Sequence, residues 1–112
     1  MLRFRARHRV CAIIIAFLFA AVPALPVRAA DTEVNIENFT FAPKELTVKA
    51  GTVIVFRNRD DIPHTVNGTN AEFHSKALDT DESFSFTFVK PGTYEYFCGL
   101  HPQMTGRVVV TP

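Results

Sequence analysis

One stretch decides how this chain is interpreted: Tyr96-Phe-Cys-Gly-Leu-His-Pro-Gln-Met104. It places a thiol, an imidazole and a thioether at positions 98, 101 and 104. A tight loop with about three residues per turn brings such positions to one side. Gly99 permits a sharp change of direction, and Pro102 has no amide hydrogen, so we expect His101 not to continue as a paired strand. The stretch therefore predicts a stiff loop that aims three donor atoms at one point.

A fourth donor comes from earlier in the chain. His64 lies in Asp61-Ile-Pro-His-Thr-Val66, 34 residues before Cys98. Pro63 restricts the backbone just before this histidine. Because the loops of a β-sandwich gather at the ends of its sheets, we expect the His64 turn and the Cys98 loop to meet there.

The remaining segments are short, rich in β-branched or aromatic residues, and separated by turn signals. Ser83–Phe88 alternates, with its three phenylalanines on one face, whereas Thr52–Asn58 is apolar on both faces and suits a central strand. Residues 71–78 could hold one short helical turn. The pattern predicts an all-β Greek-key sandwich or barrel of about seven to eight strands. The expected strands are 33–39, 45–49, 52–58, 64–67, 83–88, 93–98 and 106–111.

The donor set favours one metal. Two imidazoles and a thiolate with a weak axial thioether form the type 1 copper arrangement. Zinc prefers four strong nitrogen or sulfur donors, and calcium and magnesium prefer oxygen. Covalent haem attachment would need Cys-x-x-Cys-His, which is absent from the sequence. The sequence therefore predicts one copper ion, and its predicted ligands are His64, Cys98, His101 and Met104.

Residues 1–29 differ from the rest and predict a secretory signal peptide. Four arginines precede the uncharged run Val10–Leu25, and Val27 and Ala29 occupy the −3 and −1 positions of a cleavage site. The alternative is a retained transmembrane anchor, but 16 residues are short for a bilayer that needs about 20. We expect cleavage, a mature domain at 30–112, export to the periplasm and no stable membrane association.

Removal of this leader changes the charge and the cysteine count. The mature chain keeps 7 basic and all 11 acidic residues, a formal net charge of −4, which argues against nucleic acid as a partner. Only Cys98 remains, so an internal disulfide is impossible. A lone cysteine in an exported domain is either reactive or occupied. A metal would occupy it and cross-link a domain with a modest core.

The mature chain resembles the cupredoxins, the type 1 blue copper proteins, over nearly its whole length. Within that family the short Cys-x-x-His-x-x-Met spacing is most similar to amicyanin, since the loops of plastocyanin and pseudoazurin are longer. The resemblance implies an eight-stranded or nearly eight-stranded sandwich, three equatorial ligands (His64, Cys98 and His101), axial Met104, and electron transfer. The matching stretches are Thr47-Val-Lys-Ala-Gly-Thr52, Pro63-His64, Pro91-Gly-Thr-Tyr-Glu-Tyr-Phe-Cys98 and Gly106-Arg-Val-Val-Val110.

The sequence departs from that family in two places. Many members carry Asn just after the first histidine ligand, where it ties the two ligand loops together. This chain has Thr65 there, and we expect its hydroxyl to make a looser tie. The chain also begins close to its first strand, without the N-terminal extension of amicyanin, which leaves the partner open.

The predicted function is a single-electron carrier and not an enzyme, because four ligands leave no open position for a substrate. We expect the electron to leave through His101 and a monomeric carrier to dock weakly there with a redox partner, either a donor dehydrogenase or a cytochrome. The residues expected to form the docking patch are Leu100, Pro102, Met104, Ile62 and Pro63.

Two other functions stay open at this point. A copper-delivery or storage protein would need weaker or more exposed ligands, often rich in methionine, and the mature chain has only Met104. A Cys–His hydrolase would use Cys98 as nucleophile, but no orienting group or oxyanion loop is evident. His74 has no partner spacing, and we expect it on the surface near the site.

Overall fold

The computed structural model describes residues 12–18, 20–21, 23 and 32–112. Most of the predicted signal peptide and its cleavage site lie outside the described residues. Among the residues that are described, no helix is long and apolar enough to cross a membrane.

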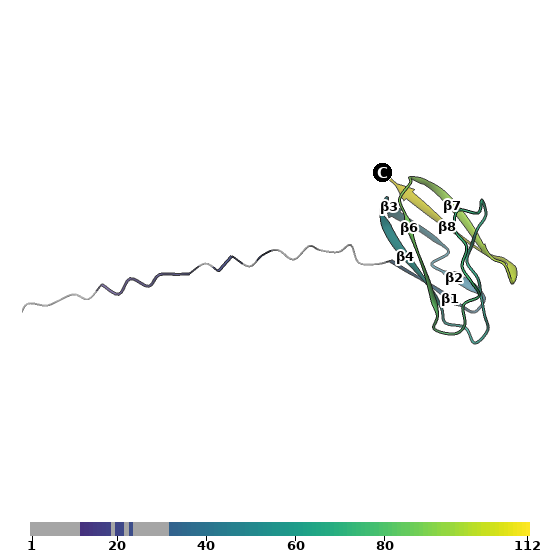
Figure 1. The fold of residues 1–112 in the computed structure, drawn as a ribbon, viewed down its shortest axis with the longest axis horizontal. Coiled ribbons are helices and arrows are strands. Elements are labelled where there is room, and N and C mark those ends of the chain that lie inside the picture. Colours follow the sequence, from purple (N-terminus) through teal and green to yellow (C-terminus); the bar gives the residue numbers. More distant parts are fainter. Residues whose placement is uncertain (1–11, 19, 22, 24–31) are drawn as a thin grey trace, which may run out of the picture.

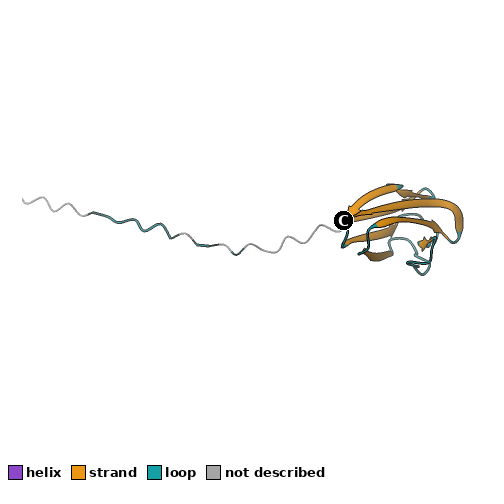
Figure 2. Cartoon of the chain, turned by 90° about the horizontal axis from the view of Figure 1, so that it is seen from above, coloured by secondary structure: helices purple, strands orange, loops and turns teal. Residues whose placement is uncertain are grey.

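The domain consists of two four-stranded sheets that lie in two layers (Figures 1 and 2). One sheet has the order β2-β1-β4-β6 and the other the order β3-β8-β7-β5. The chain passes repeatedly from one sheet to the other, so β1 pairs in parallel with β4, and β3 with β8. The strands are β1 (Thr32–Glu37), β2 (Thr40–Ala42), β3 (Glu45–Lys49), β4 (Thr52–Asn58), β5 (Asn67–Gly68), β6 (Ser83–Phe88), β7 (Gly92–Cys98) and β8 (His101–Thr111).

The core lies between the two sheets and is rich in aromatic rings. Alternating residues of each strand face inward, as a strand that is solvated on one face requires. On β7 the alternation places Tyr96 and Cys98 in the core. The Tyr96 ring packs edge-on against Phe41 and Phe56, with ring centroids 4.8 and 5.3 Å away. This packing fixes the end of β7, on which Cys98 lies.

Several strand predictions are confirmed. The strands expected at 45–49, 52–58 and 83–88 form with those bounds. The apolar strand β4 is central, between β1 and β6. An all-β sandwich of eight strands is the fold predicted from the sequence.

Three local predictions were wrong. The strand expected at 33–39 ends at Glu37, because Asn38 and Phe39 adopt positive φ and turn the chain into β2. The strand expected at 64–67 is reduced to β5, and His64 makes only an isolated bridge with Leu78. Residues 71–78 contain no helical turn; they bond across to residues 64–67 instead.

Candidate metal centre

Three of the predicted ligands come together at one end of the sandwich. The ligand atoms of His64, Cys98 and His101 all lie within 4.8 Å of one another. Cys98 is the last residue of β7 and His101 the first of β8, and the two face each other across the hairpin. His64 is positioned by a pair of backbone hydrogen bonds with Leu78. The expected meeting of the His64 turn and the Cys98 loop is therefore what the structure shows.

The spacing of these atoms fits a single transition-metal ion. The Cys98 Sγ atom is 3.7 Å from Nδ1 of His64 and 3.7 Å from Nδ1 of His101. Bond lengths of about 2.0–2.1 Å to nitrogen and about 2.3 Å to sulfur, as for zinc, put the donors of a trigonal plane about 3.8 Å apart. One thiolate with two imidazoles is a donor set for soft or borderline ions.

Burial differs among the three ligands. The Cys98 and His64 side chains are fully buried, whereas His101 is partly exposed. A buried thiolate and a buried imidazole keep water away from two sides of the site. His101 is consequently the ligand through which the site reaches the surface.

The orientation of His64 is set by a carboxylate. Its Nε2 atom lies 2.8 Å from Asp60 Oδ2, which leaves Nδ1 facing Cys98. Metal-bound histidines usually donate their other ring N–H in this way, and the bond fixes both tautomer and ring position. Burial acts to raise the pKa of Asp60, but hydrogen bonds from Phe39, His64 and Asn38 outweigh it and hold that pKa below its usual value. Asp60 is therefore an anion beside His64.

Thr65 ties the two ligand loops together more directly than the sequence indicated. Its backbone N–H donates to Cys98 Sγ at 3.3 Å, and its hydroxyl oxygen accepts from the Gly99 N–H at 2.7 Å. The same hydroxyl donates to Asn67 Oδ1 at 2.6 Å. These bonds hold the Cys98 sulfur and the residue after it against the His64 segment.

Met104 lies in an irregular part of β8. The register between β7 and β8 passes from Phe97↔Thr105 to Cys98↔His101, so residues 102–104 have no partner on β7. The prediction that His101 would not pair was wrong, because the two-residue turn places it opposite Cys98; the missing N–H of Pro102 falls in the bulge that follows. Met104 is buried at the edge of the core.

Two further residues near the predicted ligands are Phe39, which the sequence analysis did not identify, and His74, which lies on the surface as expected. Phe39 was not predicted, yet its ring lies edge-on to both imidazoles, with centroids 5.5 Å from His64 and 5.0 Å from His101. Only the left-handed turn at Asn38 and Phe39 brings it there, and a phenylalanine at positive φ is not signalled by any sequence pattern. His74 is exposed and bridges to Asn67, outside the donor group.

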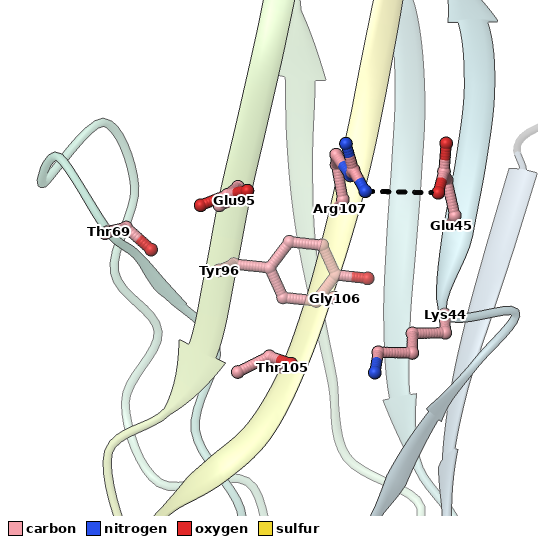
Figure 3. Close-up of a pocket in the computed structure, with 8 residues that line it drawn as sticks. All are labelled: Lys44, Glu45, Thr69, Glu95, Tyr96, Thr105, Gly106 and Arg107. Carbon is pink, nitrogen blue, oxygen red and sulfur yellow. Dashed lines mark ion pairs between the residues drawn. The ribbon is translucent and has the colours of Figure 1, made fainter.

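A pocket of about 380 Å³ lies elsewhere, over β3, β7 and β8 (Figure 3). Its lining includes the Arg107–Glu45 ion pair and the ring of Tyr96 beside Gly106. None of the four predicted ligands lines this pocket. Its polar lining contains no soft donor, so the metal chemistry belongs to the His–Cys–His group.

Comparison with known proteins identifies the family of this chain. Residues 9–110 match the family model described as a cupredoxin-like domain, and this chain belongs to that family. The matched range overlaps the predicted leader. Amicyanin-alpha of Methylorubrum extorquens is 36% identical over 87 residues, which cover 73% of this chain and 73% of the relative.

Solved structures agree with this assignment. Variants of amicyanin in the oxidized state and in the Cu(I) form each give a TM-score of 0.70 at 32% identity, over 77% of this chain and 87% of theirs. A copper-containing nitrite reductase from Thermus scotoductus SA-01 gives a TM-score of 0.74 at 28% identity. That match covers 82% of this chain but 25% of the reductase, so the likeness is to one part of a larger enzyme.

Proposed function

We propose that this chain is a single-electron carrier with one type 1 copper ion, held by His64, Cys98 and His101 in a plane and by Met104 as a weak axial ligand. The observation that carries the proposal is the placement of two Nδ1 atoms 3.7 Å from one buried thiol sulfur. The family assignment and the amicyanin likeness support the same conclusion.

The protein contributes rigidity and shielding to this function. A bound copper ion would supply the one-electron Cu(II)/Cu(I) couple. His64 and Cys98 are packed in the interior, and the Asp60 and Thr65 hydrogen bonds fix both donors. Because these contacts hold the donors in place, little movement would accompany a change of one electron, and the barrier to transfer would be small. Outer hydrogen bonds to the sulfur tune the potential.

Electrons would enter and leave through His101. Beside this partly exposed imidazole, Leu100 and Phe39 are 52% and 51% exposed, and Pro102 and Pro63 are exposed as well. Ile62 is half-buried. Met104 was expected in this patch but is buried, so it does not contribute to the surface. A small apolar patch suits brief docking with a dehydrogenase or cytochrome, since weak redox complexes use interfaces below about 1,200 Å².

The chain is proposed to act as a carrier and not as an enzyme, because a four-ligand site leaves no position for a substrate. A copper-delivery protein is the alternative. It predicts that copper leaves readily to a mild chelator, whereas a carrier with two buried ligands should retain its copper. A competition assay with a chelator of known affinity separates the two.

The spectrum of the mature protein tests the copper assignment. Addition of Cu(II) should give an intense blue colour, with the narrow EPR hyperfine splitting of a copper–thiolate site, and both should vanish on reduction. Cys98→Ala should abolish the colour. His74→Ala removes an imidazole outside the donor group and should leave the colour unchanged. A colourless copper complex of the wild type would overturn the proposal.

We also propose that residues 1–29 are removed as a signal peptide and that the monomeric domain 30–112 works in the periplasm. The charge and cleavage pattern of the leader supports this placement. Mass spectrometry of protein recovered from the periplasmic fraction tests it: the mature mass should begin at Ala30. A full-length mass in the membrane fraction would indicate a retained anchor instead.

A further inference from the structure

The turn between β1 and β2 lies directly beside the metal centre. Both of its central residues, Asn38 and Phe39, have positive φ, at 52° and 57°. Asparagine tolerates this conformation, but a bulky phenylalanine rarely adopts it. Such a residue persists only where the surrounding structure over-determines it. Something must therefore hold the turn in this shape.

The β1–β2 pairing closes the turn, and the carboxylate of Asp60 bonds both of its central amide groups. Its Oδ1 accepts the Asn38 N–H at 2.7 Å, and its Oδ2 accepts the Phe39 N–H at 3.0 Å. The same Oδ2 lies 2.8 Å from His64 Nε2. One carboxylate thus joins the strained turn to a proposed metal ligand from a segment more than 20 residues away.

Asp60 is itself fixed by the structure around it. Its N–H donates to the side-chain oxygen of Asn58, which is fully buried, and its carbonyl accepts the Thr80 hydroxyl at 2.6 Å. The Asn58 amide group in turn donates to the carbonyls of Ile62 and Leu78. The carboxylate is therefore a rigid anchor for the turn.

Held in this turn, Phe39 lies against both imidazoles. The planes of its ring and of the His64 and His101 rings meet at 88° and 90°. The His64 side chain is buried and hydrogen-bonded to Asp60, whereas the His101 imidazole is partly exposed and, among the described residues, has no side-chain contact of this kind except with the Cys98 sulfur. The His101 ring therefore packs against two rings, the fixed His64 ring and the Phe39 ring, each with its centroid 5.0 Å away, and Phe39 supports it on the side held by the turn.

We propose that Asp60 and Phe39 form a latch that positions His101: the Asp60 carboxylate holds the Asn38–Phe39 turn, and the Phe39 ring keeps His101 in the ligand plane. This role rests on the proposed function of the site. Asp60 and Phe39 are positioning residues, because neither belongs to the proposed ligand set. The latch slows copper loss through the exposed edge of the site.

Chelator kinetics test the latch. Each protein is loaded with Cu(II), and the decay of the blue colour is followed with excess chelator. Asp60→Asn removes one acceptor and should speed copper loss by about 10–100-fold, the range for outer partners of metal ligands. Asp61→Asn is the matched control: the same change of charge at an exposed neighbour, expected to change the rate less than twofold. Equal rates for the two variants would overturn the proposal.

Variants at position 39 separate the latch from general packing. Phe39→Ala should speed copper loss to the same extent as Asp60→Asn, and Phe39→Tyr should restore the wild-type rate because it keeps the ring. The double variant Asp60→Asn/Phe39→Ala should be no faster than either single variant, because both changes release one turn. A double variant that loses copper faster by the product of the two single accelerations would contradict a shared mechanism.

An NMR measurement distinguishes failure of the latch from failure of the proposed function. In the diamagnetic Cu(I) protein, Phe39 ring protons should show NOEs to His64 and His101, and these should disappear in Asp60→Asn. If the wild type takes up copper without turning blue, the proposed function fails. The latch can then still be tested, because the same NOEs can be measured in the metal-free protein of residues 30–112. NOEs that are retained in Asp60→Asn would contradict the latch in both the Cu(I) protein and the metal-free protein.

Discussion

The two sulfur atoms of the site have different surroundings. Cys98 accepts a hydrogen bond from the Thr65 N–H and is held at the end of a regular strand. Met104 lies in the bulge of β8 and is buried in the hydrophobic core cluster. The thiolate is therefore the strong donor, and the thioether is suited to tune the metal without controlling whether it binds.

Met104→Leu tests whether the two sulfur atoms have these different roles. Leucine keeps the volume and apolar character of the side chain, so the fold should survive with a loss below about 1.5 kcal/mol. Copper and its blue colour should be retained, and the reduction potential should rise because a donor that favours Cu(II) is gone. Cyclic voltammetry measures the change. A potential equal to that of the wild type would show that Met104 is not the axial ligand.

Glu82 offers a pH prediction at the scale of one side chain. The Lys76 ammonium lies 2.9 Å from its carboxylate and, with the Asp79 N–H, holds the pKa of Glu82 below its usual value. A carboxyl with a lowered folded-state pKa contributes stability above its unfolded pKa and loses it as pH falls through the folded pKa. Because both groups are at the surface, this contribution is small.

Lys76→Ala should therefore raise the pKa of Glu82 toward its ordinary value. The carboxyl carbon shift of Glu82, followed by NMR against pH, measures it. Lys90→Ala, which removes a lysine with no ion pair among the described side chains, serves as the control. An unchanged Glu82 titration in Lys76→Ala would contradict the assigned cause.

At the scale of elements, the β7–β8 hairpin connects the core to the site. Tyr96 and Gly106 face each other in the register of these strands. The Tyr96 ring crosses the position where a side chain at Gly106 would stand, and an added Cβ would lie 2.3 Å from Tyr96 Cζ (Figure 3). Gly106 is thus needed for the Tyr96 ring to reach Phe41 and Phe56 of the opposite sheet, and Tyr96 lies two residues before Cys98 on β7.

Gly106→Ala should destabilise the domain by about 1–3 kcal/mol, the usual cost of overpacking a filled core. The ring cannot move aside, because it is packed against other aromatic side chains. Urea denaturation of the copper-free protein measures the loss. Thr105→Ala alters the exposed neighbouring residue and should stay within about 0.5 kcal/mol of the wild type. Equal midpoints for the two variants would refute the steric explanation.

At the scale of the whole molecule, a bound copper ion would cross-link the domain in the way that a disulfide does elsewhere. The proposed mature domain of residues 30–112 is small, and its one cysteine, Cys98, is a ligand candidate that is free in the structure. The donors come from the segment before β5 and from the β7–β8 hairpin, so a bound ion links distant parts of the chain. Binding to the folded state alone adds stability in proportion to the logarithm of metal excess.

Copper should consequently raise the melting temperature. Free copper at 100 times its dissociation constant adds about 2.7 kcal/mol, which for a domain of this size corresponds to roughly 10–20 °C. Differential scanning calorimetry with and without Cu(II) measures the shift. Cys98→Ala should show no comparable rise, and a wild type that melts at the same temperature in both conditions would contradict the prediction.

Much of the fold and the donor set follow from local sequence patterns. Strand β6 was predictable because its three phenylalanines alternate with small polar residues, and β4 because it is apolar on both faces. The spacing of Cys98, His101 and Met104 identified a soft-metal loop. Periodicity and turn chemistry act over a few residues, so the sequence alone determines them.

Only the tertiary structure decided which residues contact those donors. Asp60 and Phe39 reach the site through a left-handed turn and through hydrogen bonds between segments 21 and 22 residues apart. The sequence predicted that His64 and Cys98 would meet, but the 3.7 Å approach of two side chains 34 residues apart depends on how the two sheets pack. Such contacts depend on the register of strands distant in sequence, and no local pattern of residues specifies that register.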